Sequence, residues 1–260
     1  MYLTWLGAAG FKLETGEGAV ILIDPFLSRP VEATPLSPIQ LTDLIVVDEI
    51  LLTDGRFDHV MDTPALVKQT GAIVHAPGPV CGRLAEAGIP AHNLECVNLG
   101  QTKRVGSLGW QAIAIQMNRA DTSAIRRALW GNRATLALVS ALSQQWPTGE
   151  RVGYIFQADG LSLLHVGSAG KVIIEVEGLQ QPDIALLPVE TAATTGDDVI
   201  RLTLQLEPKV VIPHHWDDYY PPLSETVGLD AFETALQAKT PSTRVHRPVV
   251  GQRIKVNELV

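Results

Sequence analysis

Two short clusters in this sequence combine carboxylate and imidazole side chains, the groups that hold divalent cations and move protons. Asp58 is followed directly by His59, and His214 and His215 stand side by side further along the chain. Two imidazoles and one carboxylate are a workable ligand set for a divalent cation. A simpler interpretation is that Asp58 caps a helix beside a surface histidine. Spacing alone leaves both interpretations open.

The strands that precede these residues must position them. Apolar runs at 50–52, 161–166 and 210–213 predict buried strands, and polar residues follow each one directly. Ligands of α/β folds gather at the carboxyl ends of strands, so we expect the polar tips to converge on one cleft. Side chains alternate along a strand, so only one of His214 and His215 is expected to face that cleft. The tips are residues 53–59, 117–121, 167–170 and 214–218.

The expected elements follow the same order in the two halves of the chain. Each half begins with β-rich runs and continues with alternating strands and helices. We therefore predict an α/β fold with two similar β-rich halves packed face to face and helices outside, a four-layer αββα sandwich in a single domain, residues 1–260. In the first half the expected strands are 2–6, 11–14, 19–23, 44–47, 50–52 and 73–75, and the expected helices are 61–70 and 78–87.

Residues 122–146 interrupt the second half. They predict two helices, at 124–130 and 134–145, and the second has an apolar face. Three interpretations stay open for this segment: a helix pair packed on its own domain, a lid over the cleft, or a surface for dimer formation.

The composition excludes several classes of protein. Of the 260 residues 46% are hydrophobic, which excludes a disordered chain. The net charge of −8 and the lack of a basic block longer than Arg126-Arg127 argue against a nucleic-acid partner. We expect no membrane partner and a cytoplasmic location, because no apolar run would span a bilayer and the first residues do not form a signal peptide. Cys81 and Cys96 lack CxxC spacing and are expected to be small buried hydrophobic residues.

Six motifs follow one another along nearly the whole chain. They are TWLGAAGF at 4–11, ILIDPFL at 21–27, TDGRFDH at 53–59, LHVGSAG at 164–170, DIALLP at 183–188 and VIPHHWDD at 211–218. This series resembles the metallo-β-lactamase superfamily, and within it the L-ascorbate-6-phosphate-lactonase-like branch of metal-dependent hydrolases. The corresponding motifs of that branch are tWLGHaGf, iliDPfl, THxHxDH, haGDtG, DvallPv and viPxHwd. The resemblance implies the same four-layer fold.

The departures from these motifs imply that the first metal site of the family is lost. The family holds that metal with both histidines of THxH and a histidine after a later strand, positions that carry Asp54, Arg56 and, approximately, Asn118 here. The bridging aspartate of haGD is replaced by Ser168, and the histidine of tWLGHaG by Ala8. A guanidinium keeps its proton in a protein, so Arg56 would bring a fixed positive charge to the place of a dication.

The second metal site is kept, because the resemblance maps its three terminal ligands onto Asp58, His59 and His215. Three ligands leave open positions for water and substrate. At most one divalent metal is therefore expected, and zinc, manganese or iron are the candidates. The neutral hydroxyl of Ser168 is a poor ligand, so a site without any metal is the other expectation.

Two classes of function follow from the resemblance. In the first, metal-bound water attacks an ester, lactone or phosphoester, Asp58 orients or deprotonates the water, and Arg56 stabilises an oxyanion or phosphate. In the second, the chain is a catalytically inactive, metal-free family member in which Arg56 substitutes for the cation, and it binds a small anionic ligand or acts in assembly as a homo-oligomer. The other residues expected around the cleft are Asp54, Asn118, Arg119, Ser168, His214 and Asp217.

Overall fold

The first sheet combines antiparallel and parallel strands because its connections differ in length. Short turns join the first three strands, which therefore pair antiparallel, whereas longer crossovers make the next three pairs parallel. The strand order is β16-β1-β2-β3-β4-β5-β6. The strands are β1 (Tyr2–Gly7), β2 (Gly10–Glu14), β3 (Val20–Ile23), β4 (Glu49–Leu51), β5 (Ile73–Pro77), β6 (Leu94–Val97) and β16 (Arg253–Lys255).

The second sheet repeats this plan. Its strand order is β15-β14-β13-β11-β10-β8-β7. From β7 onwards three antiparallel pairs are followed by three parallel pairs, as in the first sheet from β16 onwards. The similarity of the two halves is therefore confirmed. The strands are β7 (Thr102–Val105), β8 (Leu108–Ala114), β10 (Val152–Ala158), β11 (Leu161–His165), β13 (Ile184–Pro188), β14 (Val210–His214) and β15 (Arg244–Val245).

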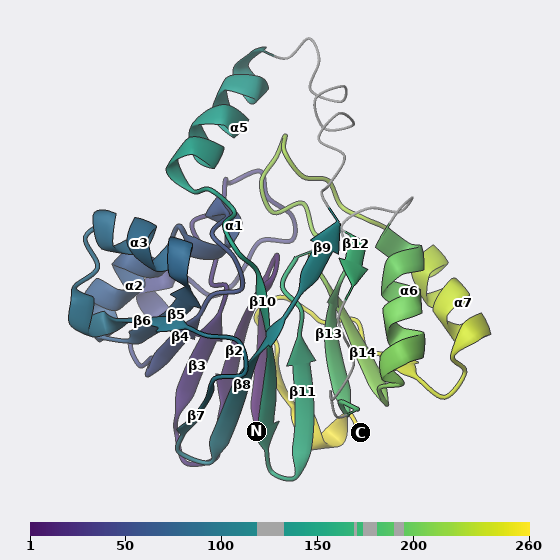
Figure 1. Cartoon of the computed structure of the whole chain (residues 1–260). Helices are drawn as coiled ribbons and strands as arrows, with labels where there is room; N and C mark the ends of the chain where they lie inside the picture. Colours follow the sequence, from purple (N-terminus) through teal and green to yellow (C-terminus); the bar gives the residue numbers. More distant parts are fainter. Residues whose placement is uncertain (119–132, 169–170, 174–180, 190–194) are drawn as a thin grey trace.

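Helices cover the outer faces of both sheets (Figure 1). The helices α2 (Thr63–Thr70) and α3 (Gly78–Glu86) lie on the first sheet, and α6 (Thr195–Leu206) and α7 (Asp230–Lys239) lie on the second. Large buried side chains fill the space between the sheets, including Trp5, Phe11, Tyr154 and Phe156. One further apolar cluster lies between the first sheet and its helices, and another lies between the second sheet and its helices. The predicted four-layer αββα sandwich is confirmed.

The computed structural model describes residues 1–118, 133–168, 171–173, 181–189 and 195–260. Among these residues, none of the helices has both the length and the apolar character needed to cross a membrane. Arg119 and the predicted helix at 124–130 lie outside the described residues.

Several expected elements differ from the structure. The predicted strand 44–47 is wrong: the segment is irregular, and Ile45 and Val46 are 70% and 60% exposed, so their apolar character does not reflect a buried strand. The helix expected to begin at residue 61 begins at Thr63, after a separate short helix α1 (Phe57–Val60). The edge strands β6, β7, β15 and β16, and helix α7, were not predicted, because short or amphipathic segments give a weak apolar pattern.

The second helix of the 122–146 segment is confirmed as α5 (Arg133–Gln145). It extends away from the sandwich (Figure 1), and Trp146, the residue after its last turn, is buried in the apolar cluster between the first sheet and its helices. Its role as a lid or dimer surface stays a prediction. Before it, β9 (Gln116–Asn118) pairs with β12 (Lys171–Ile173) in a small separate sheet.

Candidate active site

The ends of strands from both sheets meet in one buried cluster of polar residues. Asp24 follows β3, residues 53–59 follow β4, and His215 follows β14. Asp24 and His215 adopt left-handed backbone conformations, with φ of 42° and 62°, although neither is a glycine. Such conformations cost free energy and tend to concentrate at functional sites, where the surrounding structure holds them. Here they aim both side chains at the same place.

Asp58, His59 and His215 form a compact set of three donor atoms. Nε2 of His59 lies 3.6 Å and Nε2 of His215 lies 3.2 Å from Oδ2 of Asp58. All three donor atoms lie within 4.8 Å of one another, and all three residues are buried. Ligand atoms about 2.1 Å from a tetrahedral zinc ion are about 3.4 Å apart. The donor types and spacings therefore fit one divalent metal.

Asp24 fixes the orientation of the His59 ring. Oδ2 of Asp24 lies 2.8 Å from Nδ1 of His59, while the backbone N–H of Thr53 donates to Oδ1 at 2.8 Å. The hydroxyl of Thr53 donates to Oδ2 of the same carboxylate at 2.5 Å. Because Nδ1 faces a carboxylate, it carries the ring proton, and the lone pair of Nε2 faces Asp58 and His215. A carboxylate behind a histidine in this way is the usual support of a metal-binding imidazole.

Arg56 competes for the same lone pair. Its Nη2 lies 2.6 Å from Nε2 of His59 and 3.9 Å from Oδ2 of Asp58. When His59 is neutral, Nε2 accepts a hydrogen bond in this contact, since the guanidinium can only donate. Nε2 cannot bind a metal while it accepts this hydrogen bond, so Arg56 must withdraw before all three donors can bind one ion.

Asp54 holds the Arg56 side chain from the other side. Nε of Arg56 lies 3.2 Å from Oδ2 of Asp54, and the Arg56 backbone N–H donates to Oδ1 at 2.8 Å. Arg151, which precedes β10, adds a second guanidinium 3.5 Å from the same oxygen. Burial would raise the pKa of Asp54, but the charges of Arg56, His59 and Arg151 outweigh it and lower that pKa. The carboxylate is therefore ionised and positions two cations at the site.

Glycine is required between Asp54 and Arg56. A Cβ atom at Gly55 would lie 2.3 Å from the carbonyl oxygen of Pro147 and 3.1 Å from Cγ2 of Val80. The Gly55 N–H donates to the carbonyl oxygen of Thr148 at 2.8 Å. The backbone between α5 and β10, together with a side chain from the first turn of α3, thus encloses the loop that carries the two charged residues.

The charges of the cluster shift the pKa values of its members. Burial would raise the pKa of Asp58, but Arg56, His59 and His215 outweigh burial and hold this pKa well below its usual range. Burial would lower the pKa of His59, but Asp24, Asp54 and Asp58 outweigh it and raise this pKa to about 9. A second proton on His59 would sit on Nε2. Proton, guanidinium and metal therefore compete for one nitrogen.

His214 lies away from the donor set, although it is next to His215 in sequence. Its ring stacks on that of His165, with centroids 5.1 Å apart, and its edge meets Phe11 between the sheets. Burial lowers the pKa of His165 to about 4 and holds that of His214 well below its usual value, so both rings are neutral. His165 lies 2.9 Å from the Ala9 carbonyl oxygen through Nε2. These two histidines pack next to the cleft and are not part of the donor set.

The structure gives the remaining expected cleft residues different surroundings. Asp217 accepts hydrogen bonds from the Ala8 N–H at 3.1 and 3.0 Å and forms a buried ion pair with Arg29 at 2.8 Å, so it holds the β1–β2 turn. Ser168 is buried, and its hydroxyl has no hydrogen-bond partner among the described residues. Asn118 lies in β9, paired with β12.

Sequence reasoning missed the roles of three residues. In the sequence Asp24 stands directly before Pro25, which predicts only a turn, and no local pattern assigns a role to Thr53 or Arg151. The signal for Asp24 and Thr53 was present, since both occupy motif positions at strand ends. Arg151 carried no local signal, because it reaches Asp54 only where the start of β10 meets the loop after β4, through the hydrogen bond from the Val152 N–H to the Thr53 carbonyl oxygen at 2.9 Å.

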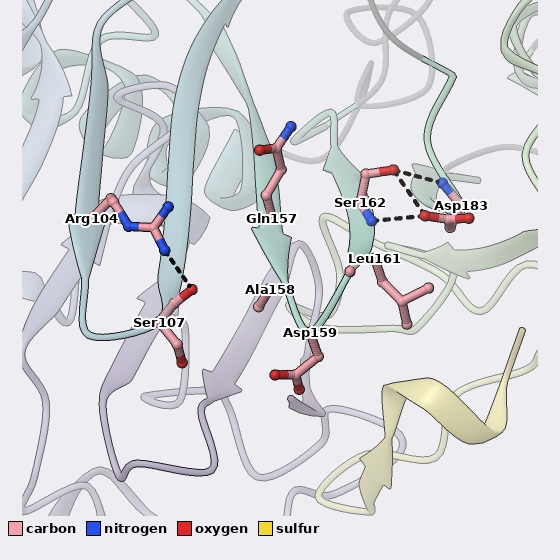
Figure 2. Close-up of a pocket in the computed structure, with 9 residues that line it drawn as sticks. Arg104, Ser107, Gln157, Ala158, Asp159, Leu161, Ser162 and Asp183 are labelled. Carbon is pink, nitrogen blue, oxygen red and sulfur yellow. Dashed lines mark hydrogen bonds between the residues drawn. The ribbon is translucent and has the colours of Figure 1, made fainter.

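A hollow of about 480 Å³ lies at the opposite end of the second sheet, between the β7–β8 and β10–β11 hairpins (Figure 2). Its polar groups bond to one another: the Ser162 N–H donates to Asp183 at 2.8 Å, and Arg104 donates to the Ser107 carbonyl oxygen at 3.3 Å (Figure 2). These side chains satisfy one another rather than converging on a ligand, so we place the functional site at the other end.

Comparison with known proteins agrees with this geometry. Residues 2–215 match the family described as "Beta-lactamase superfamily domain". A "UPF0173 metal-dependent hydrolase" of Archaeoglobus fulgidus is 32% identical over 246 residues, which cover 92% of each chain. A protein of the same name from Cupriavidus metallidurans is 31% identical over 258 residues, 96% of this chain and 83% of the relative.

Solved structures share the fold across the whole chain. Igni18, a metallo hydrolase from the archaeon Ignicoccus hospitalis, has a TM-score of 0.70 at 21% identity, covering 97% of each chain. An isothiocyanate hydrolase from Delia radicum gut bacteria has a TM-score of 0.65 at 17% identity, covering 98% of each. Assignment to the L-ascorbate-6-phosphate-lactonase-like branch stays a prediction. The match over most of the chain and the shared fold show that this protein belongs to the metallo-β-lactamase superfamily.

Proposed function

We propose that the protein is a hydrolase that holds one divalent metal between Asp58, His59 and His215 and cleaves a small anionic ester, lactone or phosphoester. The observation that carries this proposal is the spacing of the three donor atoms, 3.2 and 3.6 Å about Oδ2 of Asp58, with Asp24 orienting His59. The names of the relatives support the same class of activity.

When bound, the metal would polarise a substrate oxygen and lower the pKa of a water molecule towards neutrality. Asp58 would be one of the three ligands and, through its second oxygen, would orient that water. Asp24 and Thr53 keep His59 in the tautomer that presents Nε2.

Arg56 and Arg151 supply the positive charge for an anionic substrate. Both side chains are anchored on Asp54, and they are 23% and 21% exposed, which places them between the buried donors and solvent. Withdrawal of Arg56 from His59 leaves its nitrogens able to pair with a phosphate, a carboxylate or a developing oxyanion. One movement would thus open the donor set and present a cation to the substrate.

Metal content of the purified full chain tests this proposal. After incubation with zinc, manganese or iron and desalting, elemental analysis should find about one equivalent per chain. His215→Ala should lose both the metal and any hydrolysis of chromogenic phosphodiesters and esters. His92→Ala is the matched control, because His92 is exposed and distant from the cluster in sequence. Retention of activity in His215→Ala would refute a metal mechanism at this site.

A second candidate function is a metal-free site that binds a small anion. The observation that favours it is the 2.6 Å contact between Nη2 of Arg56 and Nε2 of His59. In this contact the guanidinium takes the place that a metal ion would occupy. Protein treated with a chelator would then bind inorganic phosphate, measured by calorimetry, and Arg56→Met would abolish the binding. Phosphate binding that requires added metal would instead support the hydrolase.

A further inference from the structure

The two cysteines lie together in the fold, although fourteen residues separate them in sequence. Cys81 is on α3 and Cys96 is on β6, the edge strand of the first sheet (Figure 1). Ala76 of β5 pairs with Cys96, and the thiol of Cys81 lies 3.4 Å from the Ala76 carbonyl oxygen. Since paired strands are about 4.8 Å apart, both cysteines lie beside Ala76, and a side-chain hydrogen bond joins their thiols.

The two thiols differ in their access to solvent. Cys81 is buried, as expected, but the prediction that Cys96 is buried is wrong, because Cys96 is exposed on the edge strand β6. Burial and a side-chain hydrogen bond with Cys96 raise the pKa of the Cys81 thiol to about 12. One thiol is thus open to reagents, and the other stays protonated beneath it.

We propose that Cys81 and Cys96 form a reactive dithiol that peroxides, or the disulfides of small thiols, convert to an intramolecular disulfide. Two independent features carry this proposal: the position of both cysteines beside Ala76, and the pairing of an accessible thiol with a buried one. The proposal is independent of metal binding and hydrolysis at the candidate active site.

The chemistry balances with a peroxide as the oxidant. The sulfur of Cys96 attacks one peroxide oxygen, the O–O bond breaks, and the products are a sulfenic acid and water. The sulfur of Cys81 then attacks the sulfenic sulfur, its proton goes to the departing oxygen, and a second water leaves. Overall two thiols lose two hydrogen atoms and two electrons, and one peroxide becomes two water molecules.

The disulfide would act close to the active-site loop. Helix α3 begins at Gly78, and its Val80, the neighbour of Cys81, packs over Gly55 between the two charged residues of the loop. A bond from Cys81 to Cys96 would tie this helix to the edge strand. Oxidation would therefore fix the support on which Asp54 and Arg56 rest.

To test this proposal, the purified full chain is treated with hydrogen peroxide or oxidised glutathione. The chain is then denatured, and its free thiols are counted by their reaction with a chromogenic disulfide. We expect both thiols to disappear together, with a mass loss of two hydrogens and a single peptide crosslink in a monomeric chain. Dithiothreitol should restore both thiols. The oxidised chain should also unfold at a higher urea concentration than the reduced chain.

Single variants separate the roles of the two residues. Cys96→Ser should leave the thiol of Cys81 unreacted, whereas Cys81→Ser should let Cys96 form a sulfenic acid or a mixed disulfide without a crosslink. Since Cys96 is exposed, its variant folds even if a change at Cys81 disturbs the core. Three results would overturn the proposal: two thiols that persist, a disulfide between two chains, or oxidation of Cys96 alone to a sulfinic acid.

Discussion

The Nη2 atom of Arg56 controls whether the site can bind a metal. Nη2 donates to the His59 nitrogen that a metal needs, and Asp54 holds the rest of the guanidinium in place. Positive charge so close to the donor set opposes a dication by several kcal/mol even in the screened environment of a protein site, by Coulomb's law at an effective dielectric constant of about 20. The arginine is therefore the main obstacle to metal binding.

Replacement of this arginine should strengthen metal binding. We expect Arg56→Met to raise zinc affinity by about tenfold or more, because methionine keeps the length of the side chain but neither donates to Nε2 nor repels the ion. Competition with a chromophoric chelator measures the change. Arg104→Met is the matched control, since Arg104 is an exposed arginine at the far end of the sheet. Equal or weaker zinc binding in Arg56→Met would show that the guanidinium does not block the site.

Asp24 acts through His59 rather than by touching the metal. Asp24→Asn keeps the shape of the side chain but removes the charge that holds the Nδ1 proton. We expect metal affinity to fall by about 10–100-fold, as is usual when the partner behind a ligating histidine is lost. The same competition assay measures it, with the exposed Asp43→Asn as control. An unchanged affinity would mean that packing alone orients the ring.

At the scale of elements, a buried carboxylate joins the two sheets. Glu49 of β4 accepts from Nε1 of Trp110 on β8 at 2.8 Å and pairs with Nζ of Lys103 on β7 at 3.0 Å. His75 of β5 lies 3.3 Å from the same carboxylate. Burial would raise the pKa of Glu49, but these partners outweigh burial and lower it. The ionised group thus links four strands.

Glu49→Gln should destabilise the fold by about 1–3 kcal/mol at neutral pH, the usual cost of weakening a buried charged hydrogen bond. Because the folded-state pKa is lowered, this stability is present above the unfolded-state pKa and is lost as pH falls through the folded-state value. The difference from the wild type should therefore shrink below about pH 4.5. Urea unfolding over a pH series measures it.

Glu95→Gln is the control for this prediction, because Glu95 meets the same lysine but is 46% exposed. Its effect should stay within about 0.5 kcal/mol at each pH. An equal loss in both variants, or a loss from Glu49→Gln that persists in acid, would show that the charge of Glu49 does not join the sheets.

At the scale of the whole molecule, the metal ligands come from both halves of the sandwich. Asp58 and His59 belong to the loop and helix after β4 in the first sheet, and His215 follows β14 in the second. The 3.2 Å contact between Asp58 and His215 spans the two halves. A bound ion would therefore crosslink the sheets and stabilise the entire fold.

Metal should raise the free energy of unfolding. At a free concentration 100 times the dissociation constant, linkage gives about 2.7 kcal/mol, provided that the unfolded chain does not bind the ion. Thermal unfolding with zinc and with a chelator measures this difference, and His215→Ala should abolish it. A metal-dependent shift that survives in His215→Ala would place the ion elsewhere.

Local patterns along the chain predict the sandwich and the repetition of its two halves, and the motif series includes Asp58, His59 and His215. These features follow from residues that are near one another along the chain. Apolar runs predict strands, and polar residues directly after them must lie at strand ends. The exposed hydrophobic segment at 44–47 shows the limit of such patterns, since an apolar run does not reveal what covers it.

Which side chains contact one another depends on the three-dimensional packing of the chain. That His215 rather than His214 joins Asp58, that Asp24 stands behind His59, and that Arg151 reaches Asp54 are distances between parts of the chain far apart in sequence. The position of Cys81 and Cys96 beside Ala76 has the same origin. Strand register and helix packing set these distances, and both depend on the burial of the whole core rather than on any local run of residues.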